Sequence, residues 1–529
     1  MKKQYVYIFL AVLVAGSFLR LYGLKKKGLF LWDESYYSLE ARTLYRMADW
    51  VFNKEKRSEP LKTYLINQGC ILPTGVGKPG YIWPFSFISF LSGSKDYSGF
   101  LLSAAAGILS MMILFFIVKI FYSQSAAFFA FVLMAFSGTS IIYSRVALSN
   151  SLTILMLLAG VYVYIKSISA DEVELKRISL AGLIIGYAYT CHYSLLPNIG
   201  LFILYEFVFL IKKRHFKRFA IFILSPLSFP VFFEIIYRGL LVGCKGALDN
   251  INYLTYFEYL IRQYTMVGSG NMSIAGLISQ DNLFYIKRII NQENIIVMIL
   301  TLAAYIYIPV KVLKKKRICD IVIYSQAVIV FMFWVFNPGT QVGRSIAVVI
   351  PFNIILISAS MDNIINKKLI YKWPVIILLF LLVAMQIGFV KKIISFRSGY
   401  KAAFSYLKSQ GSKELVVLHN WPVWQFYFNK KIYGNKDRIK NHIDLKNYAQ
   451  KNNVRYYASD YNRYRRVASD LDVFIDENYK PVLRFPSGIE HSIDYMYGRN
   501  EPPFVYEIKN DKLKGSIRIY EINDIIKER

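Results

Sequence analysis

Long apolar runs separated by short basic loops dominate the 529-residue sequence. Runs such as YVYIFLAVLVAGSF at 5–18 and WPVIILLFLLVAMQIGFV at 373–390 contain no charged residue. An apolar run of about 18 or more residues is typical of a transmembrane helix, because it is long enough to cross the hydrocarbon core. The pattern predicts a polytopic α-helical membrane protein with about eleven spans, at 5–24, 99–120, 126–143, 150–166, 178–192, 196–211, 219–237, 295–311, 318–336, 345–360 and 373–390.

The basic loops predict how these spans are oriented. The loops at 212–218 and 311–317 carry five Lys or Arg each, and the loop at 366–372 carries three. The opposing loops at 143–149 and 337–345 carry one Arg each. Basic loops stay on the cytoplasmic side, and each of these three loops follows an even number of spans, so the N-terminus lies on that side as well. The odd total of eleven then puts the C-terminal tail on the opposite side. We therefore predict a multi-pass protein of the cell (plasma or inner) membrane, with a cytoplasmic N-terminus and an extracytoplasmic tail.

The composition agrees with a membrane protein, at 55% hydrophobic residues and a mean hydropathy of +0.35. A net charge of +30 would suggest a nucleic-acid partner in a soluble chain, but here the charge lies in the loops, so no nucleic acid is expected. The apolar N-terminus resembles a signal peptide, but no small-x-small cleavage site precedes a polar start, which favours a retained first helix. The four cysteines have no metal-binding spacing, and a disulfide between Cys70 and Cys244 is an alternative left open.

Two domains are predicted. Residues 1–392 form the membrane domain, with outer loops at 25–98 and 238–294. The first loop contains WPFSFISFL, which is too short to span, and the second contains an amphipathic stretch near 251–265. Residues 393–529 change to a soluble pattern of short strands alternating with helices, which predicts an extracytoplasmic α/β domain. Its predicted strands are at 414–420, 454–460, 480–485 and 516–522, and its predicted helix is at 444–453.

Two adjacent carboxylates, Asp33 and Glu34, occur in the stretch LFLWDESYYSLEART of the first outer loop. The stretch reads as a helix that begins near Asp33, where a carboxylate is a good N-cap and is favourable at the positive end of the helix dipole. Glu40, seven positions further on, shares the helix face of Asp33, whereas Arg42 does not. From this stretch alone, a capping role and a chemical role both remain open.

Several cations are predicted at the same membrane face. Lys78 lies in KPGYIWP, and three more cations, Arg145, His192 and Arg344, lie at the outer ends of spans. Each one alone suits an interfacial anchor. Together with Asp33 they suit another role, because ionisable groups at membrane depth are costly and usually functional. A carboxylate can act as a general base on an acceptor hydroxyl, while cations stabilise a departing lipid phosphate.

These motifs resemble a known family. DESYYSLEAR is similar to the first-loop pattern D-E-x-x-Y-x-x-x-x-R of the GT-C-fold transferases that use lipid-linked sugars. Among them are the bacterial 4-amino-4-deoxy-L-arabinose transferases and the protein O-mannosyltransferases. KPGYIWP resembles their KPP…YW element. YSRVALSNSLTILMLL resembles the start of their fourth span, GLIIGYAYTCHYSLL their fifth, and GRSIAVVIP the start of a late span. The likeness runs in order through most of the first 360 residues.

The resemblance implies that Asp33 is the catalytic carboxylate and that Glu34 is part of the catalytic set, as a contact to the sugar or acceptor. It implies substrate-binding roles for Tyr37, Arg42, Lys78, Arg145, His192, Tyr193 and Arg344. Of these, Lys78, Arg145 and Arg344 would surround the lipid phosphate, while Tyr37 and Arg42 would shape the pocket.

The chain departs from the family at three positions. Asn150 stands where an Asp is frequent, and His192, which is only partly charged at neutral pH, stands where a Lys is usual. Gly77 precedes Lys78 in place of the Glu that is a metal ligand in the arabinose-transferase pattern. A bound zinc is therefore not expected, a loosely held divalent cation stays open, and no other cofactor is implied.

We therefore predict a membrane glycosyltransferase that moves a sugar from a polyprenyl-phosphate donor to a lipid, glycan or protein acceptor. The alternative is a flippase or transporter of lipid-linked saccharides, which should show internal symmetry and broken helices at the bilayer midplane. The sequence shows no internal repeat, which favours the enzyme. A catalytically inactive scaffold is a third class, and the intact Asp33–Glu34 pair argues against it.

Overall fold

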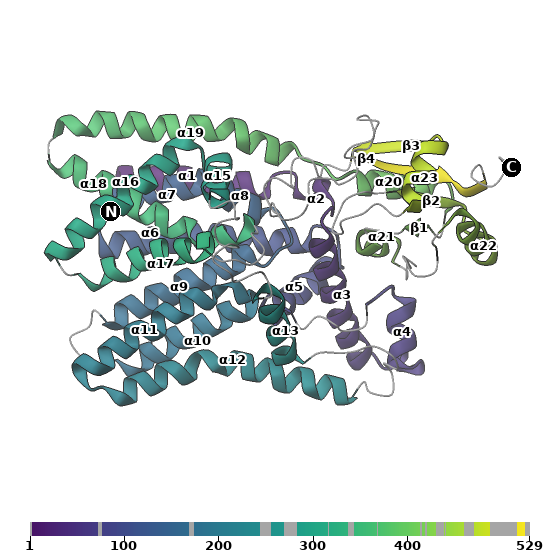
Figure 1. Cartoon of the computed structure of the whole chain (residues 1–529), viewed down its shortest axis with the longest axis horizontal. Coiled ribbons are helices and arrows are strands. Elements are labelled where there is room, and N and C mark those ends of the chain that lie inside the picture. The colour runs from purple at the N-terminus through teal and green to yellow at the C-terminus, as the bar shows by residue number, and fades with distance from the viewer. Residues whose placement is uncertain are drawn as a thin grey trace.

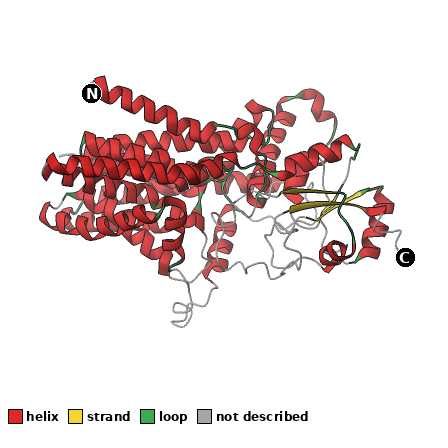
Figure 2. Ribbon diagram, turned by 90° about the horizontal axis from the view of Figure 1, so that it is seen from above, coloured by secondary structure: helices red, strands yellow, loops and turns green. Residues whose placement is uncertain are grey.

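The computed structural model describes residues 3–71, 77–168, 174–243, 255–268, 283–315, 317–336, 343–367, 369–412, 415–417, 421–429, 439, 441–459, 470–486 and 516–523. Long helices run roughly side by side through one part of the molecule, and four strands lie together beyond one end of these helices (Figure 1). Seen from above, the strands remain separate from the helical bundle (Figure 2).

The bundle contains every span that the hydropathy pattern predicts. Its helices are α1 (Lys3–Leu21), α6 (Ser98–Phe121), α7 (Gln124–Phe136), α8 (Gly138–Ser144), α9 (Asn150–Ile168), α10 (Leu175–Cys191), α11 (Leu196–Lys213), α12 (Phe216–Gly243), α16 (Ile295–Lys315), α17 (Ile318–Phe336), α18 (Ile350–Lys367) and α19 (Lys372–Ser395). Each predicted span coincides with one of them, except that 126–143 is divided between α7 and α8. The short helix η5 (Leu369–Tyr371) precedes α19.

Seven described helices are long and apolar enough to cross a membrane, or eight if α7 and α8 form one bent span. The helices α10, α16 and α18 make up the difference from eleven, so that number stays a prediction. The two halves of the bent pair meet at 55°. Ser137 lies at the break, where its side chain accepts a hydrogen bond from the Ser140 N–H and caps α8. The chain is a multi-pass membrane protein.

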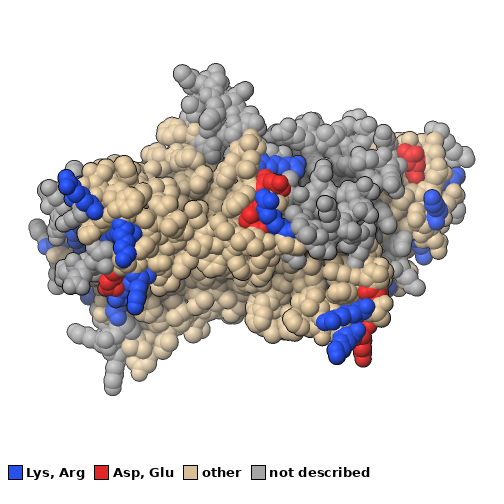
Figure 3. Space-filling model, turned by 90° about the horizontal axis from the view of Figure 1, so that it is seen from below, with Lys and Arg blue, Asp and Glu red and all other residues tan. Residues whose placement is uncertain are grey.

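Charged side chains are distributed as a membrane protein requires. On the face in Figure 3, charged side chains gather at the end of the bundle that is farthest from the strands, and again toward the opposite side of the molecule. The surface between these two regions is largely uncharged. Inside the bundle, the Arg218 guanidinium makes two hydrogen bonds of 2.8 Å and 2.7 Å to the Glu206 carboxylate, and Tyr164 donates to the same carboxylate at 2.8 Å. These hydrogen bonds join α9, α11 and α12. The two charges can be buried because each ion is compensated by the other.

Shorter helices surround the end of the bundle that faces the strands. They are α2 (Leu24–Lys27), α3 (Trp32–Phe52), η1 (Lys54–Ser58), α4 (Leu61–Asn67), α5 (Pro79–Ser92), η2 (Tyr193–Leu195), α13 (Tyr256–Gly268), α15 (Phe284–Glu293) and η4 (Gly343–Val348). Figure 1 shows α3 and α13 running across the direction of the long helices. The WPFSFISFL stretch lies in α5. The predicted amphipathic stretch at 251–265 forms a helix from Tyr256 onward, and residues 251–254 lie outside the described residues.

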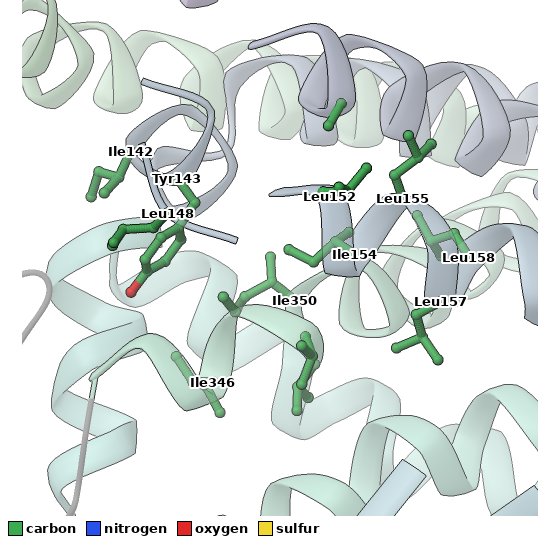
Figure 4. Packing of buried hydrophobic residues seen from close by; sticks show 14 of the residues in the cluster. Ile142, Tyr143, Leu148, Leu152, Ile154, Leu155, Leu157, Leu158, Ile346 and Ile350 are labelled. Carbon is green, nitrogen blue, oxygen red and sulfur yellow. The ribbon is translucent and has the colours of Figure 1, made fainter. Parts of the chain in front are cut away.

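A continuous apolar core lies beneath this end of the bundle. Tyr143, Leu148, Leu152 and Ile346 are at most 5% exposed and belong to one cluster with Ile350. Figure 4 shows these side chains converging from α8, α9, η4 and α18. The core therefore anchors the two-turn segment η4, which carries Arg344.

The tail forms a small α/β unit. Its elements are α20 (Gly399–Ser409), β1 (Val416–Val417), α21 (Trp421–Phe428), α22 (His442–Asn452), β2 (Tyr456–Ser459), α23 (Asp470–Asn478), β3 (Leu483–Pro486) and β4 (Ser516–Glu521). The four-stranded sheet has the order β1-β2-β4-β3, with β1 parallel to β2 and the other pairs antiparallel. The strands and the helix predicted from the sequence are all present, although the described part of the first strand is only two residues long. The domain boundary at 392/393 stays a prediction, and α19 itself extends to Ser395.

The α/β unit is attached to the segment just before α3. The Ser398 N–H donates to the Lys27 carbonyl at 2.7 Å, and its hydroxyl donates to the Leu29 carbonyl at 2.6 Å. The Leu29 N–H donates to the Tyr427 hydroxyl at 2.9 Å. Gly28, with a φ of +74°, allows the chain to turn here, where the Tyr427 hydroxyl leaves little space for a side chain. These contacts hold the start of α3 in position.

Candidate active site

The helix α3 begins one residue earlier than the sequence suggests. Trp32 is its first residue and Leu31 is the N-cap, so of the two roles left open for Asp33 the N-cap is excluded. The capping function belongs to Glu34, whose Oε2 accepts hydrogen bonds from the N–H groups of Phe30 at 3.2 Å and Leu31 at 3.4 Å. Asp33 is thereby left with its carboxylate available for other partners.

Glu34 is completely buried and is bonded on both oxygens. Its Oε1 accepts from the Lys27 ammonium at 3.2 Å and from the Ala147 N–H at 3.0 Å. Lys27 also donates to the Arg145 carbonyl at 2.6 Å. The Glu34 carboxylate therefore joins the start of α3 to the turn between α8 and α9.

Asp33 points to a different partner. Its Oδ2 accepts a hydrogen bond of 2.6 Å from the Arg344 guanidinium, which comes from η4, 311 positions away in the sequence. Asp33 is 7% exposed. A charge-assisted hydrogen bond at this length is among the stronger contacts in proteins. The pair therefore connects α3 with η4, which lies much later in the chain.

Lys78 lies beside this pair, one residue before α5. Its ammonium is 4.9 Å from the centre of the Tyr37 ring, in cation–π contact. Lys78 is 4% exposed, and burial, followed by repulsion from Arg344, lowers its pKa from 10.5 to about 7. Attraction from Asp33 and Glu40 opposes this decrease. The ammonium is thus held in a place where a further anion would be favourable.

His192 is the third basic group of the cluster. The Ser194 N–H donates to its Nδ1 at 3.1 Å, so in the neutral ring the proton is on Nε2. Burial, with repulsion from Lys78 and Arg344, lowers the pKa of His192 well below 6.5. The Nε2 atom is buried and has no hydrogen-bond partner within the described part of the chain. Tyr193 adjoins it, with the two ring centres 5.1 Å apart.

Two residues that the sequence did not assign to the site belong to this cluster. Glu40 is 6% exposed, and burial raises its pKa from 4.5 to about 8, against the effect of Lys78. Its helical spacing from Asp33 was the available signal. Tyr259, from α13, has its pKa raised by burial, and its hydroxyl interacts electrostatically with Tyr193, Glu40 and Asp33. The sequence offered no signal for Tyr259.

Arg42 does not join the cluster. Its guanidinium donates to the Phe426 carbonyl at 3.1 Å, to Asn429 Oδ1 at 3.0 Å and to the Ser94 hydroxyl at 3.2 Å. The guanidinium carbon also lies 4.0 Å from the centre of the Phe426 ring. Arg42 therefore connects α3 to α21 of the tail.

Arg145 also lies apart from the Asp33–Arg344 pair. Its Nη1 donates to the carbonyls of Leu19 at 3.0 Å and Arg20 at 3.2 Å, at the C-terminal end of α1. Such carbonyls lack intrahelical partners, and a cation is favourable there. The Nε and Nη2 atoms of Arg145 are buried without a partner among the described residues.

Three aromatic residues form the border of the site toward the tail. The rings of Trp32 and Tyr36 stack, with centres 4.7 Å apart and planes 9° apart. Trp421 from α21 lies edge-on to both, at 6.3 Å and 6.4 Å. Asp33 therefore lies next to an aromatic surface. The helix α3 contributes Trp32 and Tyr36 to this surface, and the tail contributes Trp421.

The donor atoms do not fit a tightly held metal ion. Within the described residues, no group of three or more His, Cys, Asp or Glu side chains could bind one. At Gly77, an added Cβ would lie 2.8 Å from the Tyr259 ring, so an acidic ligand has no room there. Cys244 lies outside the described residues, and its pairing with Cys70 stays an open alternative.

Comparisons with known proteins indicate which fold this chain has. Residues 76–237 match the family model described as dolichyl-phosphate-mannose-protein mannosyltransferase. ArnT from Cupriavidus metallidurans in the apo state is similar in structure, with a TM-score of 0.59 and 13% identity over 91% of this chain and 96% of that chain. The structure of the same protein bound to undecaprenyl phosphate gives 0.50 and 12% identity over 81% and 75%.

The archaeal oligosaccharyltransferase AglB from Archaeoglobus fulgidus, in complex with an inhibitory peptide and a dolichol-phosphate, is similar as well. Its TM-score is 0.53, with 10% identity over 87% of this chain and 69% of that chain. A comparison with curated proteins gave no significant match. The chain therefore has the fold of these membrane transferases.

Proposed function

We propose that this chain, a multi-pass membrane protein with the GT-C glycosyltransferase fold, transfers a sugar from a lipid-phosphate donor to an acceptor hydroxyl. The observation that carries the proposal is the Asp33–Arg344 pair, in which Asp33 is buried, with Lys78 and His192 beside it. The Asp33 carboxylate and three basic groups meet there, as a reaction with a nucleophilic hydroxyl and a phosphate leaving group requires. The partial match to a mannosyltransferase family model and the fold of ArnT and AglB support it.

The reaction forms one bond and breaks another at the same carbon. The acceptor oxygen bonds to the anomeric carbon of the sugar, and its proton passes to the Asp33 carboxylate. The bond from that carbon to the phosphate oxygen breaks, and its electron pair stays on the phosphate. Asp33 thus acts as a general base, while the cations stabilise the charge on the leaving group.

Binding of the lipid-phosphate donor helps to activate Asp33 as the base, through the Asp33–Arg344 contact. In the ligand-free protein the Arg344 guanidinium donates to Asp33 at 2.6 Å. A donor phosphate competes for the same guanidinium, since Arg binds phosphate and carboxylate oxygens with the same fork of N–H groups. When the Arg344 guanidinium binds the phosphate, its hydrogen bond to Asp33 is lost. The lone pairs of the Asp33 carboxylate are then available for the proton of the acceptor hydroxyl.

Lys78 and His192 complete the phosphate site in different ways. Lys78 supplies a buried ammonium whose pKa of about 7 rises when an anion enters. His192 supplies a neutral Nε2–H with no partner among the described residues. We assign to Glu34, Arg42 and Arg145 the task of holding this arrangement, because each of them makes its hydrogen bonds to the chain itself.

We place this site on the extracytoplasmic face of the membrane. The basic loops that the positive-inside rule assigns to the cytoplasm connect α11 with α12, α16 with α17, and α18 with α19. The site lies at the opposite ends of these helices, with α3. A lipid-linked donor in the outer leaflet reaches it from the bilayer. The acceptor is a lipid, a glycan or a protein.

The test uses membranes that contain the protein, supplied with polyprenyl-phosphate sugars and scored for sugar transfer. Asp33→Asn should reduce transfer by about 10²-fold or more, since general-base catalysis contributes about 10²–10⁴-fold. Asp49→Asn is the matched control, because Asp49 lies on the same helix in a half-buried ion pair with Lys56. Transfer by Asp33→Asn at the wild-type rate would remove Asp33 as the base.

The phosphate site is tested separately through the donor dependence. Arg344→Gln should raise the donor concentration for half-maximal transfer by about tenfold or more, since a hydrogen bond to a charged group is worth about 1.5–3 kcal/mol. The acceptor dependence serves as the control. An unchanged donor dependence would exclude Arg344 from the phosphate site.

A further inference from the structure

A groove of about 470 Å³ lies between α1 and α19, away from the Asp33–Arg344 pair. Its walls are apolar, from Leu19 on α1 and from Ile387, Val390 and Ile394 on α19, and Phe136 at the end of α7 also lines it. The volume is within the range of small-molecule sites. The groove ends at the C-terminal ends of α1 and α19, which are on the side of the bundle that carries the α/β unit (Figure 1).

The break between α7 and α8 keeps the two walls apart. On one side, the Arg20 guanidinium of α1 donates to the carbonyls of Met134 at 2.9 Å and Ala135 at 3.0 Å, which the end of α7 leaves without helical partners. On the other side, Gln386 of α19 donates to Glu293 Oε2 at 3.3 Å, and Glu293 Oε1 accepts from Ser137 at 2.6 Å. Both walls are anchored by these buried hydrogen bonds, so the groove is a built feature of the bundle.

The rim of the groove is positively charged. Lys391 and Arg397 line it, together with the polar side chains of Tyr22 and Ser395. Neither cation is in an ion pair with a carboxylate among the described residues. Arg397 uses only Nη1 in hydrogen bonds, to the carbonyls of Ile394 at 2.7 Å and Phe396 at 2.6 Å.

A third cation lies behind the α1 wall. Arg145 donates to the carbonyl of Leu19, which itself lines the groove. Arg145 is 1% exposed, and two of its nitrogens have no partner in the described part of the chain. Burial, followed by repulsion from Arg397, lowers the pKa of Arg145 to about 10. Arg145 and Arg397 repel each other, and a negatively charged group at the rim would relieve the repulsion.

We propose that this groove binds one anionic phospholipid of the adjacent leaflet, with its phosphate at Lys391 and Arg397 and an acyl chain against the apolar walls. The combination of charge and shape selects this occupant. The cationic rim favours a phosphate, which guanidinium and ammonium groups bind well, and anionic lipids are attracted to Lys and Arg near the membrane surface. The apolar walls, open to the bilayer along α19, suit an acyl chain.

The experiment measures lipid retention and thermal unfolding of the purified full chain in detergent. Phosphatidylglycerol and phosphatidylcholine are added separately, and bound lipid is counted by native mass spectrometry. The wild type should retain one phosphatidylglycerol and unfold at a higher temperature with it, whereas phosphatidylcholine should do neither. Equal retention of both lipids would overturn the proposal.

A matched pair of lysines tests the rim. Lys391→Gln should lower the affinity for phosphatidylglycerol by about fivefold, because an exposed cation near an anionic lipid contributes about 1 kcal/mol and about 1.36 kcal/mol corresponds to tenfold. Lys392→Gln should leave it within about twofold, because Lys392 is equally exposed on α19 but does not line the groove. Equal effects of the two substitutions would show that general surface charge, and not the groove, attracts the lipid.

A second pair tests the walls without removing a charge. Ile387 is 55% exposed and lines the groove, so Ile387→Trp should fill it and abolish retention. Phe380→Trp is the control, since Phe380 is 71% exposed on the same helix outside the groove. Unfolding temperatures without added lipid show that each variant is folded. Retention by Ile387→Trp at the wild-type level, or displacement of phosphatidylglycerol by equimolar undecaprenyl phosphate, would overturn the proposal.

Discussion

Lys78 should lose its charge near neutral pH in the donor-free protein, so the affinity for a lipid-phosphate donor should fall as the pH rises. Burial lowers the pKa of Lys78 from 10.5 to about 7. This decrease corresponds to about 5 kcal/mol, at about 1.36 kcal/mol per pKa unit. A phosphate at about 4 Å returns about 4 kcal/mol at an effective dielectric constant of about 20. Donor binding should therefore raise the pKa of Lys78 by about 3 units, to about 10.

The sign follows from the two pKa values. Below about 7 the ammonium is charged with or without the donor, so binding takes up no proton. Between about 7 and about 10 the bound state holds about one more proton than the free state, so the affinity should fall about tenfold per pH unit. Above about 10 both states are neutral at Lys78 and the dependence should level off.

The assay is titration calorimetry with a short-chain polyprenyl-phosphate sugar in detergent, in buffers of different ionisation enthalpy. A phosphodiester donor keeps one charge throughout the range, so any proton uptake comes from the protein. At about pH 8 the uptake should be close to one proton per donor. Lys78→Arg combined with Glu40→Gln should bind without uptake, because a guanidinium does not titrate in this range and the second titrating group is removed.

A second titrating group must be separated from this effect. Glu40 has a pKa of about 8 and interacts with Lys78, so its ionisation adds a negative charge to the site at higher pH. Glu40→Gln removes that contribution and should leave the decline that begins near pH 7. Wild-type affinity that is constant between about pH 6 and about pH 9, or a decline that persists when Lys78→Arg and Glu40→Gln are combined, would refute the assignment of Lys78 to the phosphate.

Three other predictions concern groups around the site. His192→Leu should weaken donor binding by about tenfold or more through loss of the Nε2–H donor, and neither it nor the wild type should show a pH step at about 6.5 in calorimetry, since the pKa of His192 lies well below 6.5. Arg42→Ala should make the tail separate from α3, which faster amide exchange in α21 would detect, while unchanged exchange would contradict the interface. Arg218→Met should lower the unfolding free energy by about 3–5 kcal/mol, because it leaves the Glu206 charge buried and unpaired. Adding Glu206→Leu should restore the thermal stability. A double variant as unstable as Arg218→Met would argue against this explanation.

The spans were predictable from the sequence because a membrane imposes one simple condition. Each backbone polar group must be satisfied inside the segment, so long apolar runs such as 373–390 have to be helices. The break at Ser137 was not predicted, although FSG at 136–138 provides a cap and a glycine. Whether such a segment remains straight depends on partners far along the chain, here Arg20 and Glu293, which bond to the ends that the break exposes.

The sequence predicts that the site residues lie on one face of the membrane, but not which of them contact one another. Span ends place Arg145 and Arg344 on the same face as Asp33, and nothing in the sequence distinguishes the two. In the structure, Arg344 contacts Asp33 while Arg145 bonds to the end of α1. Which way a residue faces depends on how the helices are rotated and packed, and hydropathy does not contain that information. Tyr259 was missed for the same reason, because only packing brings α13 to the site.

Asp33 and Glu34 show why two adjacent carboxylates are compatible with one buried site. Successive residues on a helix are about 100° apart, so neighbouring side chains face different partners. Glu34 is directed toward Lys27, Ala147 and the start of the helix, where its charge is compensated within the chain. Asp33 is directed toward Arg344, the partner that the proposed donor phosphate would take away. The two charges are thus neutralised by separate partners, and the Glu34 contacts hold the helix that presents Asp33.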